Sequence, residues 1–122
     1  AAPSYGEAPQ NQVAIEQSLH SARMAELQSA LAAGSARINQ SERAVVEAQS
    51  MLEARQSTLA ALEEELAMIR PLVETKVIPR VDLIKTENDV RVARKEVESA
   101  QASLARARAG VAEARAETAR IR

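Results

Sequence analysis

A seven-residue repeat of apolar side chains runs through most of the chain and constrains its fold more than any other feature. In a first long stretch the repeat places these residues: Met24, Leu31, Ile38, Val45, Leu52, Leu59, Leu66 and Val73. In a second stretch it places these: Leu83, Val90, Val97, Leu104, Val111 and Thr118. Most of them are followed three positions later by a small or apolar residue, as at the a and d positions of a left-handed coiled coil. The pattern therefore predicts long helices that each bury one narrow stripe.

The two stripes complement each other in size if the chain reverses direction at Lys76. Leu52 then faces Ala100. Almost all of the remaining layers also pair a large side chain with a small one. Such layers fill a two-helix seam without aromatic residues, and the chain contains no Phe or Trp. In one layer Val97 would face Arg55, whose aliphatic stem can lie across the seam while its guanidinium reaches water. We therefore predict an all-α fold, a long antiparallel two-helix coiled-coil hairpin. The residues predicted for its seam are Ile38, Val45, Leu52, Leu59, Leu66, Leu83, Val90, Val97, Leu104 and Val111.

Prolines mark the boundaries of the predicted hairpin. Residues 1–10 contain Pro3 and Pro9, and we interpret them as a disordered linker or domain edge. The rest, 11–122, is predicted to divide into arm one (about 11–73), a tip (74–79) and arm two (80–122).

The N-terminal end of arm one has no partner in this pairing. Arm two would end opposite about residue 30, so residues 11–29 extend beyond it. Gly34 lies close to this end, and a glycine costs about 1 kcal/mol relative to Ala in a helix interior. We therefore expect a kink, a fray or a separate short helix at the N-terminal end of the first arm.

The residue types that carry catalysis are nearly missing. His20 is the only histidine, and there is no cysteine, so a nucleophile relay or a His/Cys metal site is not expected. The 16 Lys and Arg residues are interspersed with 17 Asp and Glu, unlike the basic patch of a nucleic-acid-binding protein. We therefore predict no catalytic residues, no enzyme activity, no cofactor, no metal and no nucleic-acid partner.

The turn of the hairpin is the one place where a functional surface is expected. Apolar residues there lie at the end of a rod, where solvent is unavoidable, and exposed apolar patches mark contact sites. Pro79 suits the opening of a helix, and Asp82 complements the helix N-terminus. We call the candidate contact residues the tip surface, and they are Arg70, Leu72, Lys76, Val77, Ile78, Pro79, Arg80 and Asp82.

Residues 66–83 resemble the hairpin tip of haemolysin-D-type membrane fusion proteins. The specific part is the order of features: an apolar helix, then Pro71-Leu72-Val73, then Ile78, an acidic residue one turn later, and a long Ala/Arg/Glu helix. Together with the flanking heptads, the resemblance covers roughly residues 30–122.

This resemblance implies a periplasmic adaptor of a type I protein secretion system in a Gram-negative bacterium. Such an adaptor is anchored in the inner membrane, contacts an ABC transporter there and forms a hexamer. Its hairpin tips meet a TolC-like outer-membrane channel and complete the export conduit. The membrane helix, the lipoyl-like domain and the β-barrel domain of the family would lie outside this sequence, so any membrane contact is expected only through those segments.

Other functions stay open on the sequence alone. Related drug-efflux adaptors carry Arg, three residues, Leu, six residues and Ser at the tip, and with Leu72 as the Leu the other two places hold Met68 and Pro79. A hairpin of a multidrug-efflux adaptor is therefore one alternative. A structural coiled-coil rod with no channel partner is a second. An amphipathic helix on a lipid surface is a third, although the narrow stripe without Trp or Phe argues against it.

Overall fold

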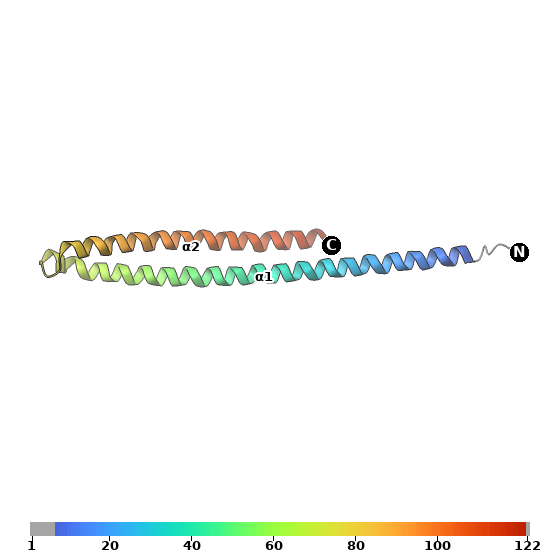
Figure 1. Cartoon of the computed structure of the whole chain (residues 1–122), viewed down its shortest axis with the longest axis horizontal. Coiled ribbons are helices and arrows are strands. Elements are labelled where there is room, and N and C mark those ends of the chain that lie inside the picture. The colour runs from blue at the N-terminus through green and yellow to red at the C-terminus, as the bar shows by residue number, and fades with distance from the viewer. Residues whose placement is uncertain (1–6, 122) are drawn as a thin grey trace.

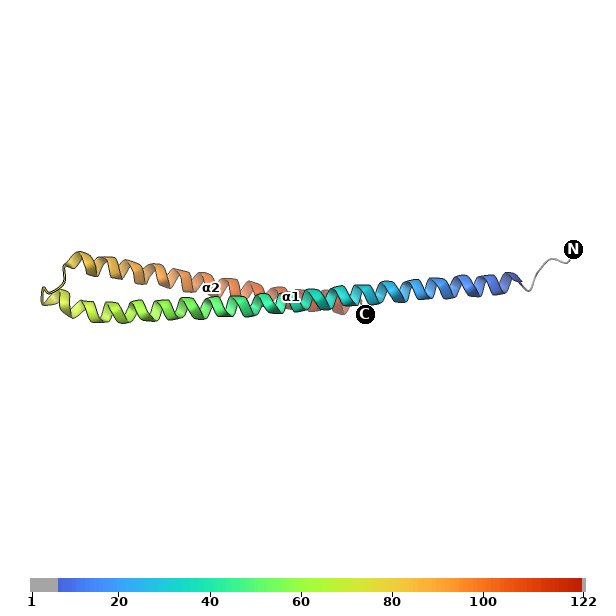
Figure 2. The ribbon, with the colours of Figure 1, turned by 60° about the horizontal axis from the view of Figure 1, so that its bottom comes forward.

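The computed structural model describes residues 7–121 and consists of two helices, α1 (Glu7–Glu74) and α2 (Arg80–Ile121). They lie side by side and run in opposite directions (Figure 1). In Figure 2 the two helices cross in projection toward the C-terminal end of α2, so they wind slightly about one another. The predicted all-α, antiparallel two-helix hairpin is confirmed.

The first helix begins earlier than the sequence indicates. Its 68 residues start at Glu7, so residues 7–10 of the expected linker are helical, while residues 1–6 lie outside the described part of the chain. Pro9 falls in the first turn, where backbone N–H groups have no intrahelical acceptor and a missing one removes no hydrogen bond. At ~1.5 Å per residue α1 is about 100 Å long.

No break occurs at Gly34. The expected kink, fray or separate short helix is replaced by a continuous α1 that passes through this position. The reason is a close contact between the two helices. A Cβ atom added to Gly34 would lie 2.6 Å from Oγ1 of Thr118 on α2, so the missing side chain makes room for Thr118. The expectation of a break rested on the helical cost of glycine and on the unpartnered residues 11–29, and it did not include this interhelical contact.

The core is a single stripe along the seam. Its buried apolar residues all occupy predicted a or d positions: Leu52, Leu66, Val90, Ala93, Val97, Ala100, Leu104 and Ala114. Of the ten residues predicted for the seam, five are among these. The other five are half-buried: Ile38, Val45, Leu59, Leu83 and Val111. A two-helix seam is open to solvent on both sides, so partial burial is its ordinary condition.

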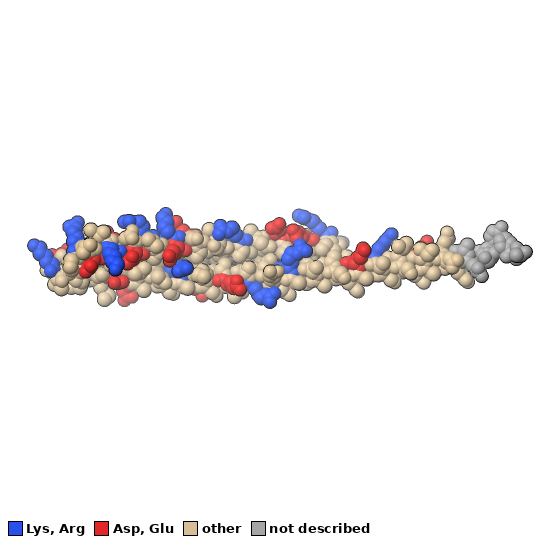
Figure 3. All heavy atoms as spheres, in the orientation of Figure 1, with Lys and Arg blue, Asp and Glu red and all other residues tan. Residues whose placement is uncertain are grey.

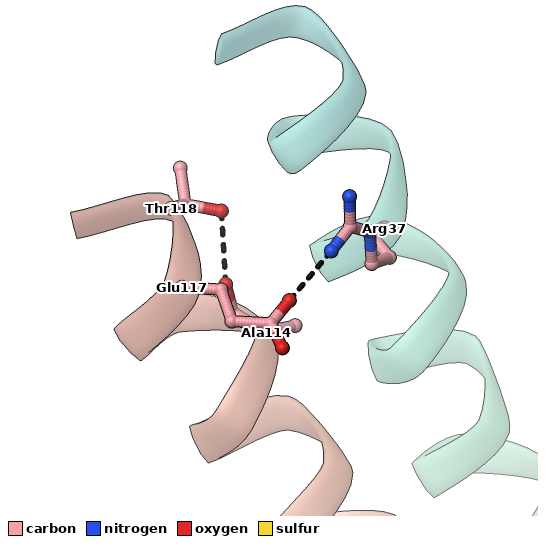
Figure 4. A network of polar contacts seen from close by, with 4 residues as sticks. All are labelled: Arg37, Ala114, Glu117 and Thr118. Carbon is pink, nitrogen blue, oxygen red and sulfur yellow. Dashed lines mark hydrogen bonds and ion pairs between the residues drawn. The ribbon is translucent and has the colours of Figure 1, made fainter. Parts of the chain in front are cut away.

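Ion pairs flank the seam at positions next to the stripe. In the heptad frame Glu42 and Arg115 are both e residues, and their Oε1 and Nη2 atoms lie 2.9 Å apart. Arg37 and Glu117, both g residues, form an ion pair on the other side of the seam (Figure 4). Exposed pairs of this kind contribute about 0–1 kcal/mol each, but e–e and g–g partners are those that an antiparallel coiled coil brings together.

Arg55 occupies a d position, which faces the apolar seam, but its guanidinium points out of the seam. Its Nη1 lies 3.4 Å from Oε2 of Glu96 on α2, and its side chain is 44% exposed. The guanidinium is therefore in water, as the sequence-based interpretation expects, and Val97 keeps its buried place in the seam.

The molecule is a rod with a large surface for its mass. The accessible surface is 9292 Å², whereas a compact monomer of 13.1 kDa would expose roughly 6,400 Å². Residues 10–26 of α1 extend beyond the end of α2 (Figure 1) and are all exposed. The two ends of the rod therefore differ, since one is a lone helix and the other is a closed turn.

Candidate docking site at the hairpin tip

The chain turns at the tip through a compact helix C-cap. The N–H of Val77 donates to the Leu72 carbonyl at 2.8 Å, and the N–H of Lys76 donates to the Val73 carbonyl at 3.0 Å. These two hydrogen bonds are those of a Schellman motif. Lys76 takes the left-handed conformation that the motif requires, with a φ of 60°. The reversal is therefore a defined structure and not a loose loop.

The Pro71 carbonyl near the end of α1 also has partners, and the Leu72 carbonyl has further ones. The Thr75 hydroxyl lies 3.2 Å from both the Pro71 and the Leu72 carbonyl oxygens, and the Ile78 N–H donates to Leu72 at 3.2 Å. Helix ends leave four carbonyls without intrahelical partners, and unpaired ones destabilise the end. The sequence Pro71–Thr75 therefore closes the helix with its own side chain and backbone groups.

The second helix starts directly after Pro79. The Pro79 carbonyl accepts the N–H of Asp82 at 3.1 Å. The helix begins at Arg80, one residue after the proline that was expected to open it. Asp82 lies in the first turn of α2, where a carboxylate interacts favourably with the helix dipole. Thr86, one turn on, is 7% exposed and donates its hydroxyl to the Asp82 carbonyl at 3.0 Å.

The apolar residues of the tip surface divide into two groups by exposure. Val77 is 70% exposed and Leu72 is 40% exposed. Ile78 is half-buried instead, and it lines a shallow hollow between the helices with Ile69 and Thr86. Ile78 therefore closes the end of the hairpin, whereas Leu72 and Val77 face solvent. The other tip-surface residues are exposed: Arg70, Lys76, Pro79, Arg80 and Asp82.

Three further exposed apolar residues near the tip were missed by the sequence reasoning. Met68 is 64% exposed, Val81 is 67% exposed and Ile84 is 58% exposed. Met68 lies four residues before Leu72, and Val81 and Ile84 are three residues apart, so each pair shares a helix face. The heptad frame could have indicated their exposure. Met68, Val81 and Ile84 occupy c, f and b positions, which point away from the seam.

Exposed cations also lie at this end of the rod, on and next to the turn. Arg70, Lys76, Arg80 and Lys85 are all exposed, and Lys and Arg side chains are visible at the tip end in Figure 3. The ion pairs found among the described residues include none of these four. The tip thus presents exposed apolar side chains beside cations that have no carboxylate partner within residues 7–121.

Residues 7–121 hold no group of three or more His, Cys, Asp or Glu residues that could bind a metal ion. Within that range, too, neither helix has a stretch long and apolar enough to cross a membrane. The arrangement at the tip can make contacts with another macromolecule through apolar and cationic side chains. It is a candidate docking site.

Comparisons with known proteins agree with this geometry. Residues 3–122 match the family model described as AprE, long alpha-helical hairpin. No curated protein and no solved structure matches the chain. The family match covers almost the whole sequence and confirms the resemblance seen in residues 66–83. The chain therefore belongs to the AprE long alpha-helical hairpin family, the hairpin domain of haemolysin-D-type adaptors of type I secretion.

Proposed function

We propose that this hairpin serves a periplasmic adaptor, or membrane fusion protein, of a type I protein secretion system and docks by its tip onto a TolC-like outer-membrane channel. Docking would complete a conduit for the exported protein. The family assignment supports the adaptor role. The observation that carries the docking role is the exposure of Leu72 and Val77 at the closed end of the rod.

The shape of the rod supports an end-on contact. Apart from Ile121 at the end of α2, large apolar residues at a and d positions are buried or half-buried where the two helices pair, and the closed end leaves Val77 70% exposed. Exposed apolar side chains are stabilised by contact with a partner. A long rod with such residues at its end can reach a partner at a distance from the rest of its own protein.

The remaining partners would be reached through parts outside this chain. An adaptor of this class would sit in the periplasm of a Gram-negative bacterium, be anchored in the inner membrane and contact an ABC transporter there. In the full-length protein it would assemble as a hexamer, which places several tips around one channel. The family assignment supports secretion-system partners of this kind.

Charged substitutions at the tip test the proposal. Leu72→Asp and Val77→Asp, each in the full-length adaptor, should abolish secretion, because a carboxylate replaces an apolar contact. Both side chains are exposed, so helicity should be unchanged and stability should shift by no more than ~0.5 kcal/mol. Secretion is measured as the exported protein in culture medium, and helicity by circular dichroism of the hairpin.

Val92→Asp is the matched control. Val92 is 50% exposed on α2, away from the turn, so its substitution should leave secretion intact. Normal secretion by both tip variants would count against docking and would favour a coiled-coil rod without a channel partner. A loss of secretion with all three variants would point to a general defect in folding or assembly.

A further inference from the structure

The segment around the turn carries more cations than carboxylates. Between residues 70 and 85 there are four cations, Arg70, Lys76, Arg80 and Lys85, and two carboxylates, Glu74 and Asp82. The four exposed cations nearest the turn join none of the ion pairs found in residues 7–121, although Glu74 and Asp82 lie within the same segment. With four cations and two carboxylates, the segment from residue 70 to residue 85 therefore has a formal net charge of +2.

Lys76 is held in a conformation that does not suit a lysine. Its φ of 60° is the left-handed region, where a side chain with a Cβ is disfavoured and glycine is the usual residue of a helix C-cap. Glycine would close this Schellman motif with less strain. Strained backbone positions cluster at functional sites, and here the strained residue is an exposed cation in the turn.

We infer that the tip recognises a protein edge that carries carboxylates beside an apolar surface, and that Lys76 is a specificity-determining residue of this contact. The inference rests on the proposed docking function and adds the chemistry of the partner. Leu72 and Val77 supply the apolar contact, and Lys76, with Arg70 and Arg80 beside it, supplies the charge. Charges around an apolar contact mainly set the association rate and the choice of partner.

The distribution of charge behind the tip favours an end-on approach. Glu64, Glu65 and Asp89 lie on the two helices just behind the cations and are exposed. An acidic partner is attracted to the tip and repelled from the sides of the rod directly behind it. Charges act over about 8 Å at physiological ionic strength, which is several residues along a helix.

Binding at two salt concentrations tests the inference. The full-length adaptor is bound to the purified outer-membrane channel of the same secretion system in 50 mM and in 500 mM NaCl. Lys76→Asn removes the charge but tolerates the left-handed backbone, and it should weaken binding about 2–5-fold at the lower salt. The difference should shrink at the higher salt, since screening reduces what Lys76 contributes.

Two companion variants separate charge from folding. Arg91→Gln removes an exposed cation of α2 that joins none of the ion pairs found in residues 7–121, and it should bind like the wild type. Lys76→Gly should weaken binding as Lys76→Asn does while raising the melting temperature of the hairpin by about 2–5 °C. If the role of Lys76 were purely structural, a variant with a higher melting temperature would not bind the channel more weakly.

The outcomes distinguish this inference from the proposed function. If both Lys76 variants bind like the wild type while Val77→Asp does not bind, the inference is overturned and docking by the tip stands. If Val77→Asp also binds normally, docking by the tip fails and takes the inference with it. Vesicles of phosphatidylethanolamine and phosphatidylglycerol serve as a further probe. Binding to them that depends on Lys76, without such dependence on the channel, would assign the cation to a lipid surface and overturn the inference.

Discussion

Gly34 and Gly110 both lie inside helices, but an added methyl group would meet different surroundings at each. At Gly110 it would find no atom within 4 Å, whereas at Gly34 it would lie 2.6 Å from Oγ1 and 2.9 Å from Cγ2 of Thr118. The Thr118 side chain cannot turn away freely, because its hydroxyl donates to the Ala114 carbonyl at 2.9 Å (Figure 4). The same residue type is therefore a helical weakness at one site and a packing requirement at the other.

Alanine substitutions at the two glycines should change the free energy of unfolding in opposite directions. Gly110→Ala is expected to raise the free energy of unfolding by about 0.5–1 kcal/mol, because alanine is the better helix former. Gly34→Ala is expected to lower it by about 1 kcal/mol, because overpacking of 1–3 kcal/mol outweighs the same helical gain. Urea unfolding followed by circular dichroism measures both. An equal stabilisation by the two substitutions would show that the Gly34–Thr118 contact is loose.

Single residues were the part of the structure hardest to predict from sequence. The left-handed Lys76 had no signal, because the residue expected at that place in a helix C-cap is glycine. Ile78 was grouped with Val77, since neighbouring apolar residues in a turn have no periodic frame that tells the buried one from the exposed one. Gly34 was interpreted through its helical cost alone, which holds only where no second helix approaches closely.

The two helices depend on one shared stripe. Leu52 is 7% exposed and belongs to the cluster with Val97, Ala100 and Leu104. Ion pairs on either side of the stripe are exposed and worth about 0–1 kcal/mol each, whereas burial of a large aliphatic side chain is worth about 1.5–3 kcal/mol. The apolar seam therefore provides most of the stability, and the ion pairs mainly favour the antiparallel register.

A large-to-small substitution in the seam should show this difference. Leu52→Ala is expected to lower the free energy of unfolding by about 2–3 kcal/mol, toward the low end for a buried leucine because the seam is open to solvent. Val46→Ala, at a position that is 65% exposed on the same helix, should change it by less than ~0.5 kcal/mol. Urea unfolding of the two variants gives the comparison. A similar loss for both would mean that the stripe is not the core.

Helices and their pairing were the part best predicted from sequence. The seven-residue repeat indicates which positions face the partner, and the match of large with small residues indicates antiparallel pairing about Lys76. Arg55 departs from the apolar pattern, and its outward placement follows from the length of its side chain. The same frame places Val81 and Ile84 on the outer face of α2. Their relevance to docking emerges only when the exposed turn is seen beside them.

At the scale of the whole molecule, residues 7–121 form a rod whose two ends differ. One end is the lone N-terminal part of α1, and the other is the closed tip with exposed Val77 and exposed cations. What meets each end cannot follow from the heptads, because they describe only contacts within the hairpin.

The most direct test of docking is site-specific cross-linking in cells. The chain contains no cysteine, so Val77→Cys at the tip and Val92→Cys on the body each add one labelled position to the hairpin of the full-length adaptor. A short photo-activatable cross-linker attached there should join Val77→Cys, but not Val92→Cys, to the outer-membrane channel. Cross-linking to the channel from the body position alone, in cells that secrete normally, would contradict docking by the tip.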